Sequence, residues 1–217
     1  MLVEREAIIL VGGGGHCRSV ADVIAAGGEF FAAGIVERRG AEAIVPACVE
    51  VIGTDEDLAA LAERYENFAI TIGQVGRSGR RRELFEYLAD LGVRLPTIVS
   101  PSGRAASSAA LGAGTVLMHN AMVNAGARIG CNCIINTAAL VEHDAEVGDH
   151  CHVATGAIVN GGCVIGDDVF LGSGAVVSHG VRIADGAIIG AGCVVVDSID
   201  ESGVYVGVPA RRMATVG

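Results

Sequence analysis

The sequence contains few residues that prevent regular backbone structure. Only four of its 217 residues are proline, whereas glycine occurs 32 times, which is about twice average usage. Glycine adopts positive φ at little cost. With so few prolines, and with alternating aliphatic residues, this composition indicates frequent backbone corners rather than a disordered chain.

The sequence also lacks long apolar runs and an excess of positive charge. No uninterrupted apolar stretch reaches the roughly 20 residues that a membrane-spanning helix requires, so a soluble protein without a membrane partner is predicted. The formal net charge of -10 disfavours nucleic acid bound through a general basic surface, although a local basic site for a phosphate remains possible. Small molecules are the expected ligands.

A secretory leader is not indicated by the first eleven residues. Glu4, Arg5 and Glu6 precede an apolar run of five residues over 7–11, which is too short and too acidic for a signal peptide. Cytoplasmic localisation is therefore predicted.

The second half of the sequence has an aliphatic residue at every sixth position. These residues are Leu111, Leu117, Val123, Ile129, Ile135, Val141, Val147, Val153, Val159, Ile165, Leu171, Val177, Ile183, Ile189 and Val195. A helix would need spacings of three and four, and an ordinary strand would need alternation, so this period indicates a repeat architecture. We predict a parallel β-helix of about five triangular coils, each made of three hexads and stacked about 4.8 Å apart.

The third residue after each aliphatic position is the predicted corner of a coil, because most residues there tolerate a left-handed backbone. These corners are Gly114, Asn120, Gly126, Asn132, Ala138, Asp144, His150, Gly156, Gly162, Asp168, Gly174, Gly180, Gly186 and Gly192. Four cysteines share a different slot, four places after an aliphatic residue, and are predicted to fill the core rather than form disulfides or bind zinc. They are Cys133, Cys151, Cys163 and Cys193.

The residue just before each corner is expected to project outward. Histidines stand at this place at His119, His143 and His179. Because eighteen residues make one coil, Ala125, His143, Gly161 and His179 form one column. Gly161 leaves space and an unshielded backbone N–H where an acyl carbonyl could approach. His119 and His179 are expected to be ordinary solvated corner residues.

The first hundred residues show alternating strand and helix patterns. Expected strands cover 7–11, 30–36, 68–72 and 94–99, and expected helices cover 18–26, 55–65 and 77–91. Such alternation predicts a small parallel sheet with a ligand site at the carboxyl ends of its strands. The predicted organisation is a Rossmann-like domain over residues 1–100, followed by a β-helix domain over 101–217.

A glycine loop between the first strand and the first helix is the candidate phosphate site. Four consecutive glycines over 12–15 precede His16, an arrangement that suits a phosphate at a helix N-terminus, although a simple tight turn is the alternative. Cys17 replaces the third glycine of the dinucleotide fingerprint, so NAD binding is not favoured. Glu37, after the second strand, is a candidate contact for a ribose or base, and Gly73 and Gln74 follow the third strand.

The run of Arg80, Arg81 and Arg82 lies on the expected helix over 77–91. Charge runs of this kind usually mark a solvated helix face, and phosphate binding is the less favoured alternative.

Several motifs together resemble a known family. They are the glycine loop with His16, the runs Ile134-Ile135-Asn136-Thr137, Val141-Glu142-His143-Asp144 and Cys151-His152-Val153, and the terminal Gly207-Val208-Pro209-Ala210. In combination they are similar to the hexapeptide-repeat acetyltransferases of the sialic-acid O-acetyltransferase and nucleotide-amino-sugar N-acetyltransferase type, including the bacillosamine-pathway enzyme. The resemblance implies a homotrimer of left-handed β-helices, an exception to right-handed crossovers, with each active site between two subunits.

The resemblance also implies roles for individual residues. His143 would be the general base for the amine or hydroxyl that attacks acetyl-CoA, and Asp144 would orient its imidazole, although Asp144 could alternatively serve only the corner conformation. The implied contacts to acetyl-CoA are Asn136, His152, Gly161 as oxyanion donor, Ser173, Gly190, Arg211 and Arg212. The implied contacts to the acceptor are Gly14, Gly15, His16, Glu37, Gly73 and Gln74.

The sequence departs from the family pattern at four places. The family often has a hydroxyl residue at the place of Gly14, glycine at that of Cys17 and aspartate at that of Glu37. It commonly has lysine where Arg211 or Arg212 stands, and arginine would still serve the coenzyme phosphates.

The predicted function is acetyl-CoA-dependent N-acetylation of a 4-amino-4,6-dideoxy sugar linked to UDP, GDP or dTDP, for surface-glycan synthesis and without a metal. O-acetylation of a sialic-acid-like sugar is the near alternative. A zinc enzyme resembling the carbonic anhydrases of this helix type would need three histidines converging across a subunit interface. A catalytically silent sugar-nucleotide-binding scaffold is the third alternative.

Overall fold

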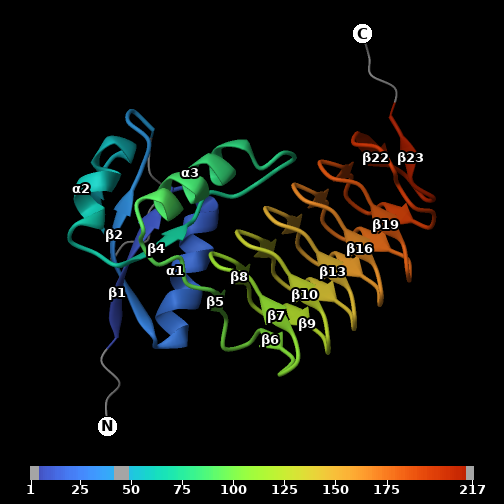
Figure 1. Ribbon diagram of the computed structural model, residues 1–217, viewed down its shortest axis with the longest axis horizontal. Helices are drawn as coiled ribbons and strands as arrows, with labels where there is room; N and C mark the ends of the chain where they lie inside the picture. Colours follow the sequence, from blue (N-terminus) through green and yellow to red (C-terminus); the bar gives the residue numbers. More distant parts are fainter. Residues whose placement is uncertain (1–4, 42–48, 214–217) are drawn as a thin grey trace.

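The computed structural model describes residues 5–41 and 49–213. An N-terminal α/β part is followed by a β-helix whose coils stack away from it, so that the last coil is the farthest (Figure 1). Within the described ranges, no helix combines the length and apolarity needed to cross a membrane.

A four-stranded parallel sheet forms the centre of the N-terminal part, in the order β3-β2-β1-β4. Its strands are β1 (Glu6–Val11), β2 (Phe30–Val36), β3 (Val51–Gly53) and β4 (Asn67–Ile70). Ile8 and Leu10 of β1 pack with helix α1 (Gly15–Gly27) on one face. Alternate residues of β1 pack on the other face with α2 (Leu58–Ala62) and α3 (Gly79–Asp90). Burial on both faces explains the continuous apolar run of β1.

The elements expected in this part are found with shifted ends. Helix α1 begins at Gly15 rather than at residue 18, and strand β4 ends at Ile70 rather than at residue 72. The helix expected over 55–65 is a 3-10 turn, η1 (Asp55–Asp57), followed by the short α2, and Thr54 caps its start. Strand β3 has no counterpart among the predictions.

The strand expected over 94–99 is wrong for most of its length. Only β5 (Ile98–Val99) is a strand, and it pairs with β8 of the β-helix rather than with the N-terminal sheet. Arg94 makes an isolated bridge to Asn67 of β4. The chain therefore passes from one sheet to the other within these few residues.

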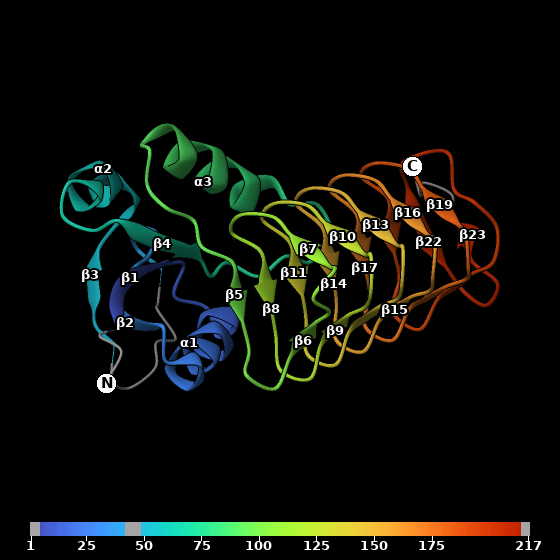
Figure 2. The ribbon, with the colours of Figure 1, turned by 60° about the horizontal axis from the view of Figure 1, so that its bottom comes forward.

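The β-helix consists of two-residue strands that recur every six residues. After β5 they are β6 (Arg104–Ala105), β7 (Ala110–Leu111), β8 (Val116–Leu117), β9 (Met122–Val123), β10 (Arg128–Ile129), β11 (Ile134–Ile135), β12 (Leu140–Val141), β13 (Glu146–Val147), β14 (His152–Val153), β15 (Ile158–Val159), β16 (Val164–Ile165), β17 (Phe170–Leu171), β18 (Val176–Val177), β19 (Arg182–Ile183), β20 (Ile188–Ile189) and β21 (Val194–Val195). They form a five-stranded, a six-stranded and an eight-stranded sheet, which are the three faces of a left-handed triangular helix (Figure 2). The predicted fold class is confirmed.

The register confirms the coil length of eighteen residues. Ile134 lies beside His152, and Leu140 beside Ile158, as parallel neighbours in successive coils. The eight-stranded sheet is completed by β22 (Val204–Val206), parallel to β20, and by β23 (Arg211–Arg212), antiparallel to β22.

All fourteen predicted corners have positive φ, between 53° and 72°. At each corner the backbone N–H reaches back one coil: for example, Asp144 N donates to Ala125 O at 3.0 Å, and Gly162 N donates to His143 O at 3.0 Å. The four cysteines assigned to the core are at most 1% exposed. The period of six thus correctly predicted both the corner residues and these core residues of the coil.

Arg81 joins the α/β part to the β-helix. Its guanidinium is fully buried, and its Nη1 donates to the carbonyl oxygens of Ile70 at 2.6 Å and Ile72 at 3.0 Å. Nε donates to the carbonyl of Asn132 at 3.3 Å. Burial lowers the pKa of Arg81 to about 10, so the side chain keeps its charge at neutral pH.

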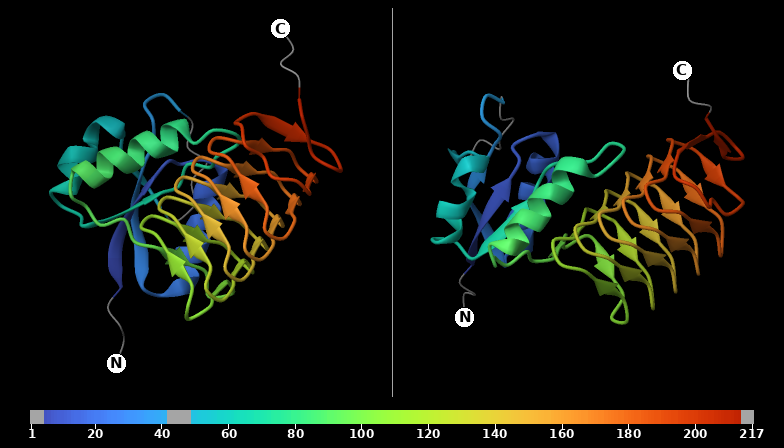
Figure 3. Two further views of the ribbon diagram at one scale, coloured as in Figure 1. Left: turned by 45° about the vertical axis from the view of Figure 1, so that its right-hand side comes forward. Right: turned by 45° about the horizontal axis from the view of Figure 1, so that its top comes forward.

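The interpretation of the arginine run as a solvated face is therefore wrong for Arg81. Arg82 also reaches the β-helix, where its Nη1 lies 2.8 Å from Asp168 Oδ2. Arg80 is the exposed member, and pairs with Asp55 at 2.6 Å. Helix α3 accordingly lies alongside the coils in the views of Figure 3.

One edge of the β-helix carries a ladder of carboxylates over glycines. The Oδ1 atoms of Asp149, Asp167 and Asp185 accept backbone N–H groups from the residues eighteen places earlier, at 2.6, 2.7 and 2.9 Å. A Cβ at Gly148 would lie 2.8 Å from the backbone nitrogen of Asp167. Only glycine leaves room for this ladder.

We expect Gly148→Ala to lower the free energy of unfolding by about 1 to 3 kcal/mol, because the new Cβ overlaps backbone atoms that cannot move aside. The matched control is Gly27→Ala, since no heavy atom lies within 4 Å of its added Cβ and alanine favours its helix. Urea unfolding of both variants measures the difference. Equal stabilities would contradict the ladder as a packing constraint.

Candidate active site

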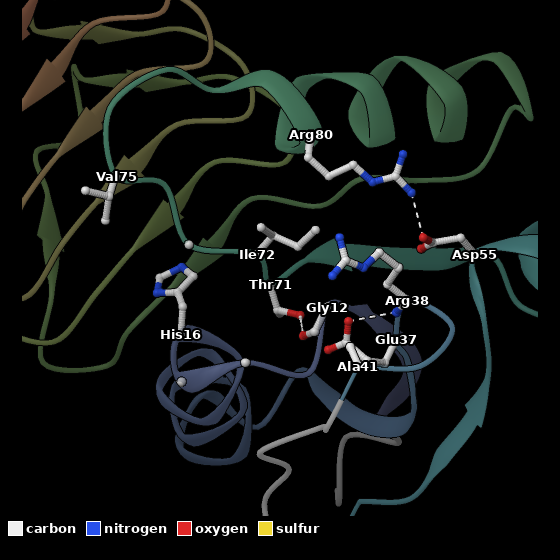
Figure 4. Close-up of a pocket in the computed structure, with 13 residues that line it drawn as sticks. Gly12, His16, Glu37, Arg38, Ala41, Asp55, Thr71, Ile72, Val75 and Arg80 are labelled. Carbon is white, nitrogen blue, oxygen red and sulfur yellow. Dashed lines mark hydrogen bonds and ion pairs between the residues drawn. The ribbon is translucent and has the colours of Figure 1, made fainter.

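A pocket of about 470 Å³ opens over the carboxyl ends of β1 and β4. Figure 4 shows the glycine loop entering α1 at its base, with Glu37 and Arg38 on one side and His16 on the other. Its lining includes five of the six predicted acceptor contacts: Gly14, Gly15, His16, Glu37 and Gly73. Gln74 is absent from the lining.

The backbone of the glycine loop faces open space. A Cβ at Gly14 or Gly15 would meet no heavy atom within 4 Å, and α1 begins here without an acidic residue in its first turn. The N–H groups of Gly14 and Gly15 make no hydrogen bond to any residue that the structure describes. Unpaired donors at the positive end of a helix dipole form a site for an anion such as phosphate.

Glu37 holds one side of this loop. Its Oε2 accepts the Gly13 N–H at 2.5 Å, and its Oε1 accepts the Arg38 N–H at 2.7 Å. The carboxylate therefore occupies the Gly13 donor, which leaves the donors of Gly14 and Gly15 for an anionic ligand.

His16 is held as a neutral imidazole on the other side. Burial, with smaller contributions from the positive charge of Arg81 and from His152, lowers the pKa of His16 to about 3. Its Nε2 is buried and has no partner within 5–41 and 49–213. A Cβ at Gly73 would lie 3.3 Å from His16 Cβ, so Gly73 lets the loop after β4 pack against this ring.

The loop after β4 is held to the eight-stranded sheet by hydrogen bonds among Gln74, His152 and Asn136. His152 donates from Nδ1 to the Gln74 carbonyl at 2.6 Å, and its Nε2 accepts from Asn136 Nδ2 at 3.0 Å. Burial lowers the pKa of His152 to about 4, which keeps the ring neutral. The Gln74 side chain is 3% exposed and donates to Gly76 O at 3.1 Å. Both ring nitrogens of His152 are thus committed within the chain.

His143 stands exposed on the edge that joins the six-stranded and five-stranded sheets. Its Nδ1 lies 2.9 Å from Asp144 Oδ2, and this hydrogen bond raises the pKa of His143. Asp144 itself sits at the corner with φ 58°, so one residue serves both the conformation and the imidazole. With Nδ1–H held by the carboxylate, Nε2 is the free basic nitrogen.

Gly161 lies directly beside the free nitrogen of His143. A Cβ at this position would be 2.7 Å from His143 Nε2, so the ring lies where any side chain would be. The Gly161 carbonyl accepts from Gly180 N at 3.1 Å, whereas its N–H bonds to nothing in the part of the chain that the structure describes. An imidazole base and a free backbone donor therefore face the same space.

The expectation for His119 is wrong. Its side chain is only 29% exposed, and its Nδ1 lies 2.8 Å from Ser100 Oγ while Nε2 lies 3.0 Å from Asp22 Oδ2 of α1. His119 is therefore a second contact between the two parts. His179 is exposed, as expected.

The remaining predicted coenzyme contacts lie in the later coils. Ser173 is exposed just before the corner at Gly174, whereas the Gly190 N–H already donates to Tyr205 O at 2.8 Å. Arg212 pairs with Glu201 at 2.5 Å, and the Arg211 side chain donates to Ala210 O at 2.7 Å. Both arginines are exposed.

Within a single chain, His143 does not lie beside the glycine-loop pocket. The α/β part contacts the eight-stranded sheet through His152 and the adjoining edge through Asn132 and Asp168. His143 lies on the edge between the other two sheets, opposite that face. Among the described residues, no group of three or more His, Cys, Asp or Glu side chains is placed to hold a metal.

Comparison with known proteins shows the family. Residues 7–88 match the PglD N-terminal domain, and residues 162–197 match the bacterial transferase hexapeptide. The acetyltransferase domain of PglB from Neisseria gonorrhoeae is 31% identical over 96% of this chain and 100% of its own, with a TM-score of 0.87. A histidine-to-alanine variant of GDP-perosamine N-acetyltransferase from Caulobacter crescentus is 35% identical over 96% and 97%, with a TM-score of 0.89. The chain belongs to the nucleotide-amino-sugar acetyltransferases.

Membership of the nucleotide-amino-sugar acetyltransferases confirms the predicted family and makes the chain an enzyme. WeeI from Acinetobacter baumannii is 24% identical over 96% of this chain and 100% of its own, with a TM-score of 0.81, and shows the shared fold alone. A search of curated proteins finds no significant match.

The lowered pKa values of His16 and His152 predict a pH-dependent stability. Because the pKa values of His16 and His152 are about 3 and about 4 in the folded state, the unfolded chain binds more protons below its histidine pKa of about 6.5. The free energy of unfolding should fall by about 1 to 2 kcal/mol per histidine between about pH 7 and pH 5.

Urea unfolding of His152→Gln tests this source, because the variant should lose the contribution of His152, about 1 to 2 kcal/mol between about pH 7 and pH 5. The exposed His179→Gln should keep the wild-type dependence. A His152→Gln protein with an unchanged pH dependence would contradict the assignment.

Proposed function

We propose that the chain transfers the acetyl group of acetyl-CoA to the amino group of a 4-amino-4,6-dideoxy sugar linked to UDP, GDP or dTDP. The observation that carries the proposal is the exposed His143–Asp144 pair beside the free N–H of Gly161. The Caulobacter crescentus relative was crystallised with CoA and GDP-perosamine, and the PglB domain with acetyl-CoA, which supports the same pair of substrates here.

His143 serves as the general base. Asp144 accepts the Nδ1–H, so Nε2 takes the proton of the sugar amine as its nitrogen attacks the thioester carbonyl. The Gly161 N–H stabilises the negative oxygen of the tetrahedral intermediate. When the carbon–sulfur bond breaks, the amide is complete and coenzyme A leaves as a thiolate. No metal takes part in these steps.

The acceptor binds through its nucleoside diphosphate at the glycine loop. The free N–H groups of Gly14 and Gly15 and the buried Nε2 of His16 suit phosphate oxygens. Glu37 retains lone pairs for hydroxyl or N–H donors of the ribose or base. Gly73 shapes the wall on the side of the loop after β4, and Gln74 holds this loop through the hydrogen bond from His152 to its carbonyl.

The coenzyme extends from Gly161 toward the last coils. Ser173 and Gly190 lie in later coils, on the edge between the eight-stranded and six-stranded sheets, so they would contact a coenzyme held at the Gly161 edge of a neighbouring subunit. Arg211 and Arg212 stand near the end of the β-helix for the phosphates. Asn136 and His152 contribute by fixing the Gln74 segment that borders the acceptor pocket. We further propose that the reaction takes place in the cytoplasm and serves surface-glycan synthesis.

A homotrimer completes the active site. Because the pocket and His143 lie on opposite sides of one β-helix, the pocket of one subunit would be served by the His143 edge of its neighbour.

We also propose a domain boundary near residue 100, just after β5 joins the β-helix sheet.

We expect His143→Ala to lower kcat by about 10²- to 10⁴-fold, because it removes the base. The assay is release of free thiol from acetyl-CoA with a panel of UDP-, GDP- and dTDP-linked 4-amino sugars. Turnover with sialic-acid-like hydroxyl acceptors alone would support O-acetylation instead. Stoichiometric zinc in the purified protein would count against the proposal.

Mixed oligomers test the shared site. Gly15→Trp fills the acceptor pocket and His143→Ala removes the base, so each variant alone should be inactive. Random reassembly of an equal mixture should restore about a quarter of wild-type activity, the fraction of interfaces with an intact pocket on one side and His143 on the other. Activity no higher than that of the single variants would place the whole site within one chain.

A further inference from the structure

His179 faces His143 across the gap at Gly161. The two rings belong to the same column, two coils apart, with centroids separated by 6.4 Å and planes tilted by 44°. The intervening position is glycine, so no side chain stands between them. A Cβ at Gly162 would lie 3.8 Å from His179 Cε1, which shows that the ring leans over this gap.

Two exposed imidazoles and one free backbone N–H therefore border a single space. His143 contributes the basic Nε2 and Gly161 contributes the donor, and both have parts in the proposed acetyl transfer. Of these three groups, His179 alone has no part in the acetyl transfer proposed above. Its ring makes no hydrogen bond to any part of the chain that the structure describes, so its N–H is available to a ligand.

We propose that His179 is a further catalytic residue, which donates an N–H hydrogen bond to the sulfur of coenzyme A as the thioester breaks. The inference rests on the proposed acetyl transfer and assigns a group to the leaving atom.

The order of the coils places the sulfur on the side of His179. In the tetrahedral intermediate the amine nitrogen lies toward His143 and the oxygen toward Gly161, which leaves the far side for sulfur or methyl. The proposed phosphate contacts Arg211 and Arg212 are in the last coils, beyond His179 along the axis. The body of the coenzyme, and with it the sulfur, therefore extends from Gly161 toward His179.

The step balances without another reactant. The carbon–nitrogen bond forms as the amine proton moves to His143, and the carbon–sulfur bond breaks with its electron pair on sulfur. The His179 N–H stabilises this thiolate without transferring its proton. The thiolate then takes up, through solvent, the proton that His143 holds, which returns both imidazoles to their starting states.

The first test compares donors with different leaving thiols. With acetyl-CoA, His179→Ala should lower kcat by about 10- to 100-fold, the usual effect of one hydrogen bond to a charged group, with little change in KM. With 4-nitrophenyl thioacetate, whose thiolate is stable without help, the loss should be less than about threefold. His179→Gln keeps an N–H donor and should recover part of the rate.

The matched control is Ser107→Ala, which changes an exposed residue of the same column two coils to the other side of His143 and should leave kcat unchanged. Equal losses with both donors would show a structural effect and overturn the proposal. So would a loss confined to KM, or a His179→Ala enzyme as fast as wild type.

A second measurement needs no turnover, so that failure of this proposal is distinguishable from failure of the acetyl transfer. The ultraviolet absorbance of bound coenzyme A reports the pKa of its thiol. A donor at the sulfur should lower this pKa in the wild-type complex, and His179→Ala should raise it by about one unit. Identical thiol pKa values in the two complexes would overturn the role of His179 even if acetyl transfer is observed.

Discussion

The left-handed corner at every sixth residue is the constraint on which the β-helix depends. A non-glycine residue at such a corner costs about 1 to 2 kcal/mol, yet Asn120, Ala138 and Asp144 all adopt it. The corner N–H offsets part of this cost by donating to the preceding coil, to a carbonyl at Ala138 and Asp144 and to the Ser102 hydroxyl at Asn120. Because each corner is bonded to the coil before it, residues eighteen places apart are held in fixed columns.

Two columns show how glycine makes room within this frame. Beneath the carboxylates of Asp149 and Asp167, glycine lets a side chain satisfy backbone donors of the preceding coil. Beside His143, glycine leaves a donor unsatisfied and gives the imidazole its place. The same absence of a Cβ stabilises one edge and opens a reactive space on another.

The α/β part is fastened to the β-helix by buried polar groups rather than by an apolar interface alone. Arg81 reaches three carbonyl groups without a carboxylate, and His152 spends both nitrogens on Gln74 and Asn136. Losing one partner would leave a buried charge or donor unpaired, which is costly. The loop that borders the acceptor pocket is therefore held by the coils themselves, through groups that permit few alternative positions.

Much of the fold could be predicted because its rule is local. The period of six places each residue in the core, at a corner or outside, and it located His143 and Gly161 correctly relative to each other. It says nothing about which face the α/β part covers. For this reason the burial of Arg81, the commitment of His152 and the contact of His119 with Asp22 were missed. Strand β3 and the pairing of β5 with β8 likewise depend on long-range contacts.

The coil of eighteen residues also restricts how such a protein can change length. Removing one whole coil would shorten the molecule and leave every surviving column in line. Removing a single residue between His143 and Gly161 would shift every later residue by one place in its hexad, so that core residues would leave the core and Gly161 would no longer lie beside His143. The β-helix can therefore lengthen or shorten only by whole coils, and we expect other insertions to be tolerated only as loops that leave the helix at its corners.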